Sequence, residues 1–317
     1  MSGLRNLRLL KTLPGKSRDR AEPAVFLCIG AQKAGTTWLA DNLKGHEDLL
    51  IAKRKEVHYF DVLDGQSPST FRRAQRRVTS LLKKLPPRPG PNFDAAMEEI
   101  DSAYANLNIY RGGWHDHEPY FDYLREGYGG QRYVCDFTPA YSTLSEMGFS
   151  RMAAALPGAK YLFVLRDPLD RHWSSMRMSA FRRAKDADEG KALVLEEARK
   201  FAANSAESVP LRSDYARTIG ELERVAPREN IHYEFFETLF TSDAIARVCR
   251  FLGVAPVEAA FEEKSREGTP VRLPEDCAAG FLRRLAGQYE FCAEKFGGAL
   301  PERWQARIAQ LKEAAID

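Results

Sequence analysis

Short apolar runs recur along this chain, and each is followed by a turn and then by a segment with helical spacing. Residues 25–29 form the first such run, which ends at Gly30, and residues 160–165 form the most strand-like one. Runs that are apolar throughout, instead of alternating with polar residues, are typical of parallel strands buried on both faces. The pattern therefore predicts an α/β fold in which helices flank a central parallel sheet.

The same pattern predicts further elements in chain order. Additional strands are expected at 49–52, 132–136 and 230–236, and helices at 36–43, 68–85, 144–156, from 168 onward, and at 188–226, 242–252, 274–296 and 301–315. Residues 86–91 contain four prolines and break this regularity, as an extended connector would. We interpret residues 62–130 as an insertion between two core strands, so that residues 24–317 form a single domain.

Composition narrows the class of protein. At 317 residues and 44% hydrophobic content, the chain can bury the core of one large α/β domain or two small ones. The net charge is only +3, so the chain as a whole is not expected to bind nucleic acid. No apolar run approaches the roughly 20 residues that a membrane span needs, so no transmembrane segment is expected. The five cysteines include no C-x-x-C pair, which favours a reducing compartment and a cytoplasmic protein.

The first 23 residues are basic, with six lysines and arginines and no acidic residue before Asp19. They lack the apolar stretch of a secretory signal peptide, because Lys11 interrupts the Leu9-Leu10 pair. A transit peptide and a solvated leader are both compatible with this composition. We interpret residues 1–23 as a flexible basic leader ahead of the first strand.

An anion-binding loop is predicted between the first strand and the first helix. Backbone N–H groups at the start of a helix have no partner within the helix, and the helix dipole adds to their attraction for phosphate or sulfate. The segment keeps both glycines (Gly30, Gly35) and the last hydroxyl (Thr37) of the P-loop pattern G-x-x-x-x-G-K-[ST]. Thr36 replaces the lysine of that pattern, and Lys33 lies inside the loop instead. The alternative is a chance turn between a strand and a helix.

A second strand-to-helix junction follows residues 160–165. It presents Arg166 directly after the strand, Pro168 at a position suited to a first helical turn, and Ser174 eight residues after the arginine. A guanidinium and a hydroxyl at a strand end suit a second phosphate. The alternative interpretation is a surface ion pair between neighbouring arginine and aspartate side chains.

Other candidate functional residues lie between these two junctions. Glu56 stands among three cations and is either a neutralising partner or a candidate base for a hydroxyl acceptor. The helix predicted at 68–85 is amphipathic and basic, which is typical of a solvated face but also suits a sulfated or carboxylated acceptor or a phosphate-rich partner. Trp114 lies in a glycine- and aromatic-rich loop, where it suits stacking on a sugar or aromatic acceptor.

The two junctions together resemble those of the sulfotransferases that use 3′-phosphoadenosine 5′-phosphosulfate (PAPS). Residues 32–39 look like that family's 5′-phosphosulfate loop, and residues 165–174 look like its 3′-phosphate element. Residues 55–61 are similar to the branch that includes heparan sulfate and bacterial sulfotransferases, where the glutamate is the base. Residues 138–141 and 289–304 fit the same branch, so the resemblance spans most of residues 24–304.

The resemblance implies a P-loop-type strand-loop-helix nucleotide site and a sulfotransferase that uses no metal. Such an enzyme moves a sulfuryl group from PAPS to a hydroxyl or amine of an acceptor, such as a carbohydrate or small molecule, and releases 3′-phosphoadenosine 5′-phosphate (PAP). The residues implied to bind the donor are Lys33, Ala34, Gly35, Thr36, Thr37, Trp38, Arg166, Ser174, Lys264, Ser265 and Arg266. The residues expected to contact the acceptor, chiefly in the region 62–130 and beside it, are His58, Trp114, Thr138 and Tyr141.

Catalytic roles are implied for two of these residues. Lys33 would stabilise the oxygen that leaves with the nucleotide, and Glu56 would accept the proton of the acceptor. Arg166 and Ser174 would hold the 3′-phosphate, and Trp38 would stack on the adenine. Two departures from the family pattern stand out. Phe137 occupies a position where many relatives carry a lysine, and residues 264–269 match a third donor-contacting segment only loosely.

Two other functions stay open from the sequence alone. A P-loop kinase would use ATP and magnesium, with Asp136 at a strand end as the metal-holding carboxylate, but it would lack the lysine that Thr36 replaces. A non-catalytic nucleotide-binding protein or a scaffold would bind the nucleotide tightly without turnover. The identity of the acceptor and the oligomeric state do not follow from these patterns.

Overall fold

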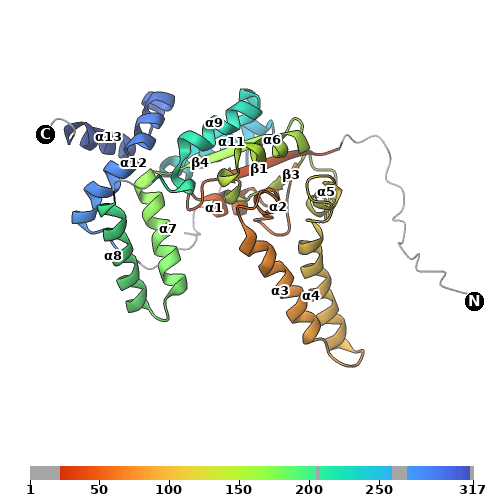
Figure 1. Cartoon of the computed structure of the whole chain (residues 1–317). Coiled ribbons are helices and arrows are strands. Elements are labelled where there is room, and N and C mark those ends of the chain that lie inside the picture. Colours follow the sequence, from red (N-terminus) through yellow and green to blue (C-terminus); the bar gives the residue numbers. More distant parts are fainter. Residues whose placement is uncertain (1–21, 205–207, 259–269, 315–317) are drawn as a thin grey trace, which may run out of the picture.

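A single sheet of five parallel strands forms the centre of the molecule (Figure 1). The computed structural model describes residues 22–204, 208–258 and 270–314. The strand order is β2-β3-β1-β4-β5, with β1 (Ala24–Gly30), β2 (Leu49–Ile51), β3 (Tyr133–Asp136), β4 (Lys160–Leu165) and β5 (Ile231–Phe235). Helices flank this sheet, so the predicted α/β fold with a parallel central sheet is confirmed.

The two central strands explain the uninterrupted apolar runs of the sequence. In β1 every residue after Ala24 is buried, and in β4 every residue after Lys160 is buried. β1 pairs in parallel with β3 on one side, where Phe26 lies opposite Cys135, and with β4 on the other, where Cys28 lies opposite Leu162. A strand with neighbours on both edges and helices on both faces has no solvated side that would require polar residues.

The helices were largely predicted, and their bounds are as follows. The α-helices are α1 (Thr36–Leu43), α2 (Tyr59–Leu63), α3 (Pro68–Lys83), α4 (Pro91–Asn108), α5 (Glu118–Leu124), α6 (Glu146–Ala155), α7 (Pro168–Arg183), α8 (Ala187–Ala203), α9 (Tyr215–Val225), α10 (Phe236–Leu239), α11 (Ser242–Leu252), α12 (Glu275–Phe296) and α13 (Glu302–Glu313). Short 3₁₀ turns are η1 (Pro139–Thr143), η2 (Leu211–Ser213), η3 (Arg228–Asn230) and η4 (Gly297–Ala299). In the described ranges, none of these helices is both long enough and apolar enough to cross a membrane.

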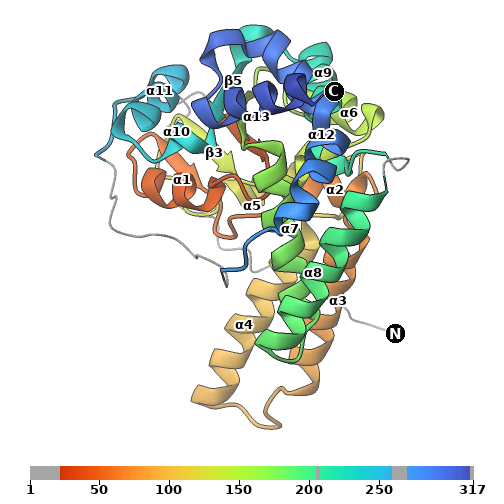
Figure 2. The ribbon, with the colours of Figure 1, turned by 90° about the vertical axis from the view of Figure 1, so that its left-hand side faces the viewer.

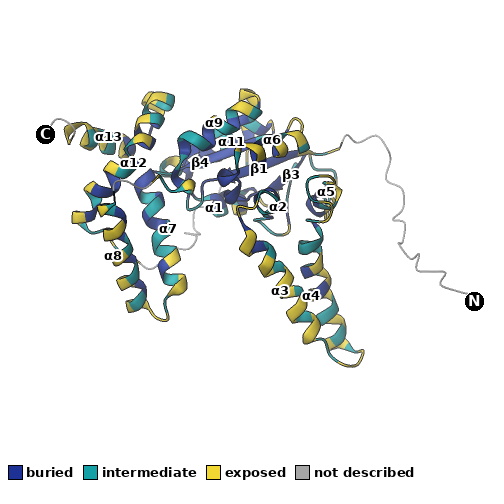
Figure 3. Cartoon of the chain, viewed as in Figure 1, coloured by how far each residue is buried: buried dark blue, intermediate teal, exposed yellow. Residues whose placement is uncertain are grey.

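Two helical hairpins extend from one side of the molecule. The α3–α4 pair and the α7–α8 pair project in the same direction in both views (Figures 1 and 2). Buried residues concentrate in the sheet and in the helix faces that cover it, whereas the far ends of both hairpins are mostly exposed (Figure 3). The hairpins therefore add surface beside the sheet rather than forming its core.

The short helices α2, α5 and α10 were not predicted, and the sequence pattern differs from the structure at two larger places. Residues 188–226 were predicted as helical throughout, but α8 ends at Ala203 and α9 begins at Tyr215, after Pro210 and the turn η2. The carboxylate of Asp214 accepts a hydrogen bond from the N–H of Arg217 and so caps α9 as a separate helix. Helix α4 was not predicted, because Pro91 was assigned to the connector. It is instead the first residue of that helix, where proline loses no helical hydrogen bond.

Candidate active site

The topology of the sheet brings the two predicted anion-binding junctions together. After β1 the chain crosses toward β2, whereas after β4 it continues toward β5, although β1 and β4 are neighbours. Ligands of open parallel sheets bind outside the carboxyl ends of two strands whose connections diverge in this way. Residues 31–35 and Arg166 both follow the carboxyl ends of these strands. The N–H of Ala31 donates to the carbonyl of Val164 (2.7 Å) and fixes the loop against β4.

The loop after β1 leaves the start of α1 open to an anion. Gly35 is the residue that precedes this helix, and its φ of 79° lies in the left-handed region that favours glycine. A Cβ atom there would come within 2.8 Å of the buried Leu239 side chain. In the described part of the chain no side chain caps α1. The N–H groups of its first turn, including those of Thr36 and Thr37, are therefore available to a bound phosphate or sulfate.

Four positive charges gather at this junction, and we call Lys33, Arg166, Arg177 and Arg182 the cation cluster. Burial lowers the pKa of Lys33, and the neighbouring charges of the three arginines lower it further. The guanidinium of Arg166 donates from Nη1 to the carbonyl of Lys33 (2.8 Å) and lies over the ring of Phe236. Because repulsion between like charges is relieved by an anion placed among them, the cluster is a candidate anion site.

The Arg166 guanidinium can still donate a hydrogen bond to a ligand. Burial lowers its pKa, although Asp170 and Glu237 lie near enough to oppose this. Among the described residues neither carboxylate forms an ion pair with it, and its buried Nε has no hydrogen-bond partner. Buried donors without partners are rare in folded proteins, and a bound anion would satisfy this one. The residues present therefore fit a nucleotide phosphate.

Helix α7 supplies further side chains beside Arg166 and Lys33. Ser174 is buried on it, with 7% of its surface exposed. Sequence analysis predicted Ser174 but missed Arg177 and Arg182 on the same helix. A signal was present, because residues three apart on a helix share a face and Arg177 follows Ser174 at that spacing. Arg171 was missed as well. It is 1% exposed, donates to Ser213, and has no partner for Nε and Nη1 within the described residues.

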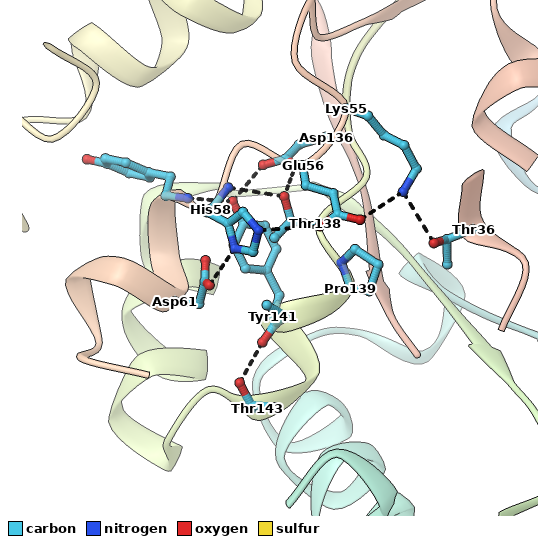
Figure 4. Close-up of polar contacts among 12 residues, drawn as sticks. Thr36, Lys55, Glu56, His58, Asp61, Asp136, Thr138, Pro139, Tyr141 and Thr143 are labelled. Atoms are coloured by element: carbon cyan, nitrogen blue, oxygen red, sulfur yellow. Dashed lines mark hydrogen bonds and ion pairs between the residues drawn. The ribbon is translucent and has the colours of Figure 1, made fainter. Parts of the chain in front are cut away.

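Glu56 lies in a chain of charged side chains on the loop between β2 and α2 (Figure 4). One of its carboxylate oxygens is 3.3 Å from Nε2 of His58, and Nδ1 of His58 is 2.7 Å from the carboxylate of Asp61. Asp61 is fully buried at the start of α2, whereas Glu56 is partly exposed. We call these three residues the Glu56–His58–Asp61 network. The imidazole fixes the direction in which the exposed carboxylate points.

The charges of this network are strongly coupled. Burial opposes ionisation of Glu56, but the hydrogen bond from His58 and the charge of Lys55 outweigh it and lower its pKa to about 2. Burial would lower the pKa of His58, but hydrogen bonds to Asp61 and Glu56 raise it to about 9. At neutral pH the network therefore holds an imidazolium between two carboxylates, and Glu56 is ionised.

Lys55 connects the network with the anion-binding loop. Its ammonium nitrogen is 3.3 Å from Oε1 of Glu56 and 3.4 Å from the hydroxyl of Thr36 (Figure 4). Thr36 opens helix α1, so the lysine spans from the carboxylate to the first turn of that helix. A group bound at the helix start and a hydroxyl held by Glu56 would thus face each other across Lys55.

Asp136 organises the strand end beneath the network. It is fully buried at the end of β3 and accepts hydrogen bonds from the hydroxyls of Thr138 (2.5 Å), Tyr141 (2.6 Å) and Tyr120 (3.1 Å). Burial raises its pKa to about 6. Both carboxylate oxygens are occupied, so Asp136 positions these hydroxyls. The N–H of His58 in turn donates to the hydroxyl of Thr138. This arrangement argues against Asp136 as the exposed metal ligand of a kinase.

The remaining predicted residues lie in varied surroundings. Trp38 is 4% exposed and its ring packs on Phe240, so it offers little surface to an adenine. Trp114 donates to the carbonyl of Leu63 and lies beside Arg151. Ala34 is buried in the loop. The three predicted donor-binding residues of the later loop, Lys264, Ser265 and Arg266, and most of the basic leader fall outside the described residues.

Arg212 is a further cation that sequence analysis missed. It belongs to η2, in the segment that was predicted as continuous helix. Burial lowers its pKa, while the charges of Asp61 and Glu56 act in the opposite direction. These carboxylates are therefore close enough to interact with it. Arg212 therefore supplies positive charge beside the Glu56–His58–Asp61 network.

Comparisons with known proteins identify the family and the fold. The model of the family described as "Sulfotransferase family" matches residues 23–258. The chain is similar to a crystal structure of a sulfotransferase from Alicyclobacillus acidocaldarius, with a TM-score of 0.57, 24% identity, and 90% of this chain and 99% of the other covered. At this identity the similarity shows the fold alone. No curated protein sequence matched the chain.

Two further structures are similar at lower TM-scores. One is a sulfotransferase domain from the curacin biosynthetic pathway, with 15% identity, a TM-score of 0.45, and 92% of this chain and 98% of the other covered. The other is a sulfotransferase domain from the Synechococcus PCC 7002 olefin synthase, with 16% identity, a TM-score of 0.43, and 88% and 98% covered.

The Glu56–His58–Asp61 network predicts a pH-dependent stability. Because the pKa of His58 is raised from 6.5 to about 9 in the folded protein, protonation of this side chain stabilises the fold. The contribution is complete below pH 6.5 and is lost as the pH rises through about 9. A rise of this size is worth up to about 3 kcal/mol. We expect the free energy of unfolding of His58→Gln to lie below that of the unmodified protein at pH 6, with the gap closing by pH 10, in urea titrations.

His115→Gln is the matched control, because His115 is an exposed histidine outside the network. Its urea titrations should give the same difference from the unmodified protein at both pH values. A His58→Gln deficit that stays constant from pH 6 to pH 10 would show that the imidazolium is not what stabilises the network.

Proposed function

This chain belongs to the sulfotransferase family, and we propose that it transfers a sulfuryl group from PAPS to a hydroxyl or amine of an acceptor and releases PAP. The observation that carries the proposal is the cation cluster at the junction of β1 and β4, beside the uncapped start of α1. PAPS supplies an activated sulfuryl group attached to one phosphate and a second phosphate at the far end of the nucleotide. The cation cluster and the start of α1 offer positive charge and N–H groups for both phosphates of the nucleotide.

Different residues act at the two ends of the nucleotide. Arg166 and Ser174 hold the 3′-phosphate, a charge remote from the reacting atoms that aligns the donor. Lys33 and the N–H groups of Thr36 and Thr37 stabilise the negative charge that grows on the bridging oxygen as its bond to sulfur breaks. Sulfuryl transfer resembles phosphoryl transfer, where a loose in-line transition state makes positioning and charge stabilisation the main contributions.

Glu56 acts on the acceptor. The acceptor oxygen forms the new bond to sulfur, and its proton passes to the carboxylate of Glu56, so the charges balance. A pKa near 2 makes Glu56 a weak base in the resting protein. In a loose transition state this suffices, because the hydroxyl becomes acidic only as its bond to sulfur forms. His58 and Asp61 hold the carboxylate toward the hydroxyl, and Lys55 holds it toward Thr36.

The rival functions find less support. Thr36 stands where an ATP-using P-loop would carry its lysine, and Asp136 is buried with both oxygens hydrogen-bonded.

Transfer of ³⁵S-labelled sulfate from PAPS to a panel of hydroxyl and amine acceptors, in the presence of EDTA, tests the proposal. Label in an acceptor supports it. Transfer that instead requires ATP and magnesium, or tight PAP binding without any turnover, would replace it with one of the rivals.

Lys33→Ala separates catalysis from donor binding. Removal of one preorganised donor to a developing negative charge typically costs 10²–10³-fold in kcat, so we expect a loss of about that size. The affinity for PAP, measured by calorimetry, should fall less than about tenfold, because the rest of the cluster and the helix start remain. Lys44→Ala, which removes an exposed lysine just after α1, is the control and should leave both quantities unchanged. Equal losses in kcat and PAP affinity would assign Lys33 to binding only.

Glu56→Gln tests the base. The amide keeps the size of the side chain but cannot take the proton, so we expect a loss of transfer of at least about 10²-fold. PAP affinity should stay near that of the unmodified protein, since Glu56 lies on the acceptor side. Glu47→Gln, at an exposed position, is the matched control. Normal turnover of Glu56→Gln would remove this residue from the role of base.

A further inference from the structure

A pocket lies between the helices of the α3–α4 hairpin and is separate from the cation cluster. Its volume is about 290 Å³. Residues of both helices line it together with Arg54, which belongs to the loop between β2 and α2. The side chains of Ala74 and Ala103 are small and leave room for the pocket between the helices, and Thr70 and Ser102 add hydroxyl groups to its lining. The space suits a ring-sized fragment of a small molecule.

The pocket carries excess positive charge. Its lining contains three arginines, Arg54, Arg73 and Arg77, and one acid, Glu99. Arg77 and Glu99 form an ion pair that links α3 to α4. In the described part of the chain no ion pair or hydrogen bond engages the side chains of Arg54 or Arg73. The pocket therefore presents two guanidinium groups without a carboxylate partner.

Arg54 connects this pocket with the proposed base. Its neighbours in sequence are both paired, Lys53 with Glu126 (3.0 Å) and Lys55 with Glu56 (3.3 Å). Arg54 is the cation of this run that turns to the α3–α4 pocket instead. One residue, Lys55, separates it from Glu56, so the Cα atoms of Arg54 and Glu56 lie within about 7 Å of each other. Arg54 therefore places one wall of the pocket close along the chain to the proposed base.

Resting on the proposed function, we infer that the α3–α4 pocket binds an anionic group of the acceptor, remote from the hydroxyl that is sulfated. A carboxylate or a sulfate ester has the planar or branched oxygens that a guanidinium binds with two parallel hydrogen bonds. Arg54 and Arg73 supply these donors, and the alanines contact the ring that carries the anion. The enzyme then selects acceptors that are already negatively charged.

The binding of a carboxylate probe to the PAP-saturated protein tests this inference without knowledge of the acceptor. The probe is 2-naphthoate, compared with its neutral counterpart 2-naphthamide in fluorescence titrations. We expect the unmodified protein to bind the naphthoate at least about tenfold more tightly, as charge-assisted hydrogen bonds predict. Arg54→Gln and Arg73→Gln should each remove most of this preference. Equal affinity of the two probes, or variants that keep the preference, would overturn the inference.

Arg72→Gln is the matched control, because Arg72 is exposed on the same helix but does not line the pocket. It should keep the full preference for naphthoate. Inorganic sulfate should displace the naphthoate only at far higher concentrations than those of the probe. Displacement by sulfate at equal concentration would show that the pocket binds a free anion rather than part of an acceptor.

PAP affinity, measured on each variant by calorimetry, keeps this inference apart from the proposed function. The arginine variants should bind PAP as the unmodified protein does, which also shows that they are folded. If even the unmodified protein fails to bind PAP, the proposed function fails, while the difference in naphthoate affinity between the unmodified protein and Arg54→Gln or Arg73→Gln still reports on the pocket itself. If PAP binds normally and the naphthoate preference is absent, only the α3–α4 pocket assignment fails.

Discussion

Repulsion among like charges at the junction of β1 and β4 is the constraint on which the rest of this site depends. Lys33 and Arg166 are partly withdrawn from water, and burial lowers the pKa of each. Neither forms an ion pair with a carboxylate in the ranges that the structure describes. A protein tolerates such an arrangement at a cost to its stability, and bound anions recover that cost. The β1–β4 divergence places this charge at the end of the sheet where ligands of parallel sheets bind.

The proposed acceptor side has the opposite arrangement, in which each charge has a partner. Glu56 is held by Lys55 and His58, and His58 is held in turn by Asp61. The buried Asp136 fixes the strand end below by accepting three hydroxyl hydrogen bonds. A paired carboxylate keeps its direction, which matters where positioning contributes most of the rate. The proposed donor side thus concentrates positive charge, whereas each charge on the proposed acceptor side has a partner within the chain.

Local patterns in the sequence predicted most of what lies on single strand-loop-helix units. Lys33 and Arg166 each follow a buried apolar run, so their placement at a strand end could be predicted. Arg212 could not be, because the break between α8 and α9 depends on a turn that the helical pattern of 188–226 conceals. Similarly, stacking of Trp38 on an adenine was predicted from its place in the loop-helix unit, but its packing against Phe240, far along the chain, could not be predicted.

The α3–α4 pocket was beyond prediction for the same reason. Its basic helix was recognised, but Arg73 gains meaning only from α4, which the proline connector hid, and from Arg54 on another loop. Side chains that converge from three segments leave no periodic signal in any one of them. Sequence patterns thus predict which side chains one segment places together, whereas a site built from several segments becomes visible only in the folded structure.

The central claim is that the cation cluster binds both ends of one nucleotide. Calorimetry of PAP and of adenosine 5′-phosphate, on the unmodified protein and on Arg166→Ala, tests it most directly. If Arg166 holds the 3′-phosphate, the unmodified protein prefers PAP by a factor of about ten to one hundred, and Arg166→Ala loses most of that preference. An unchanged preference for PAP in Arg166→Ala would contradict the account.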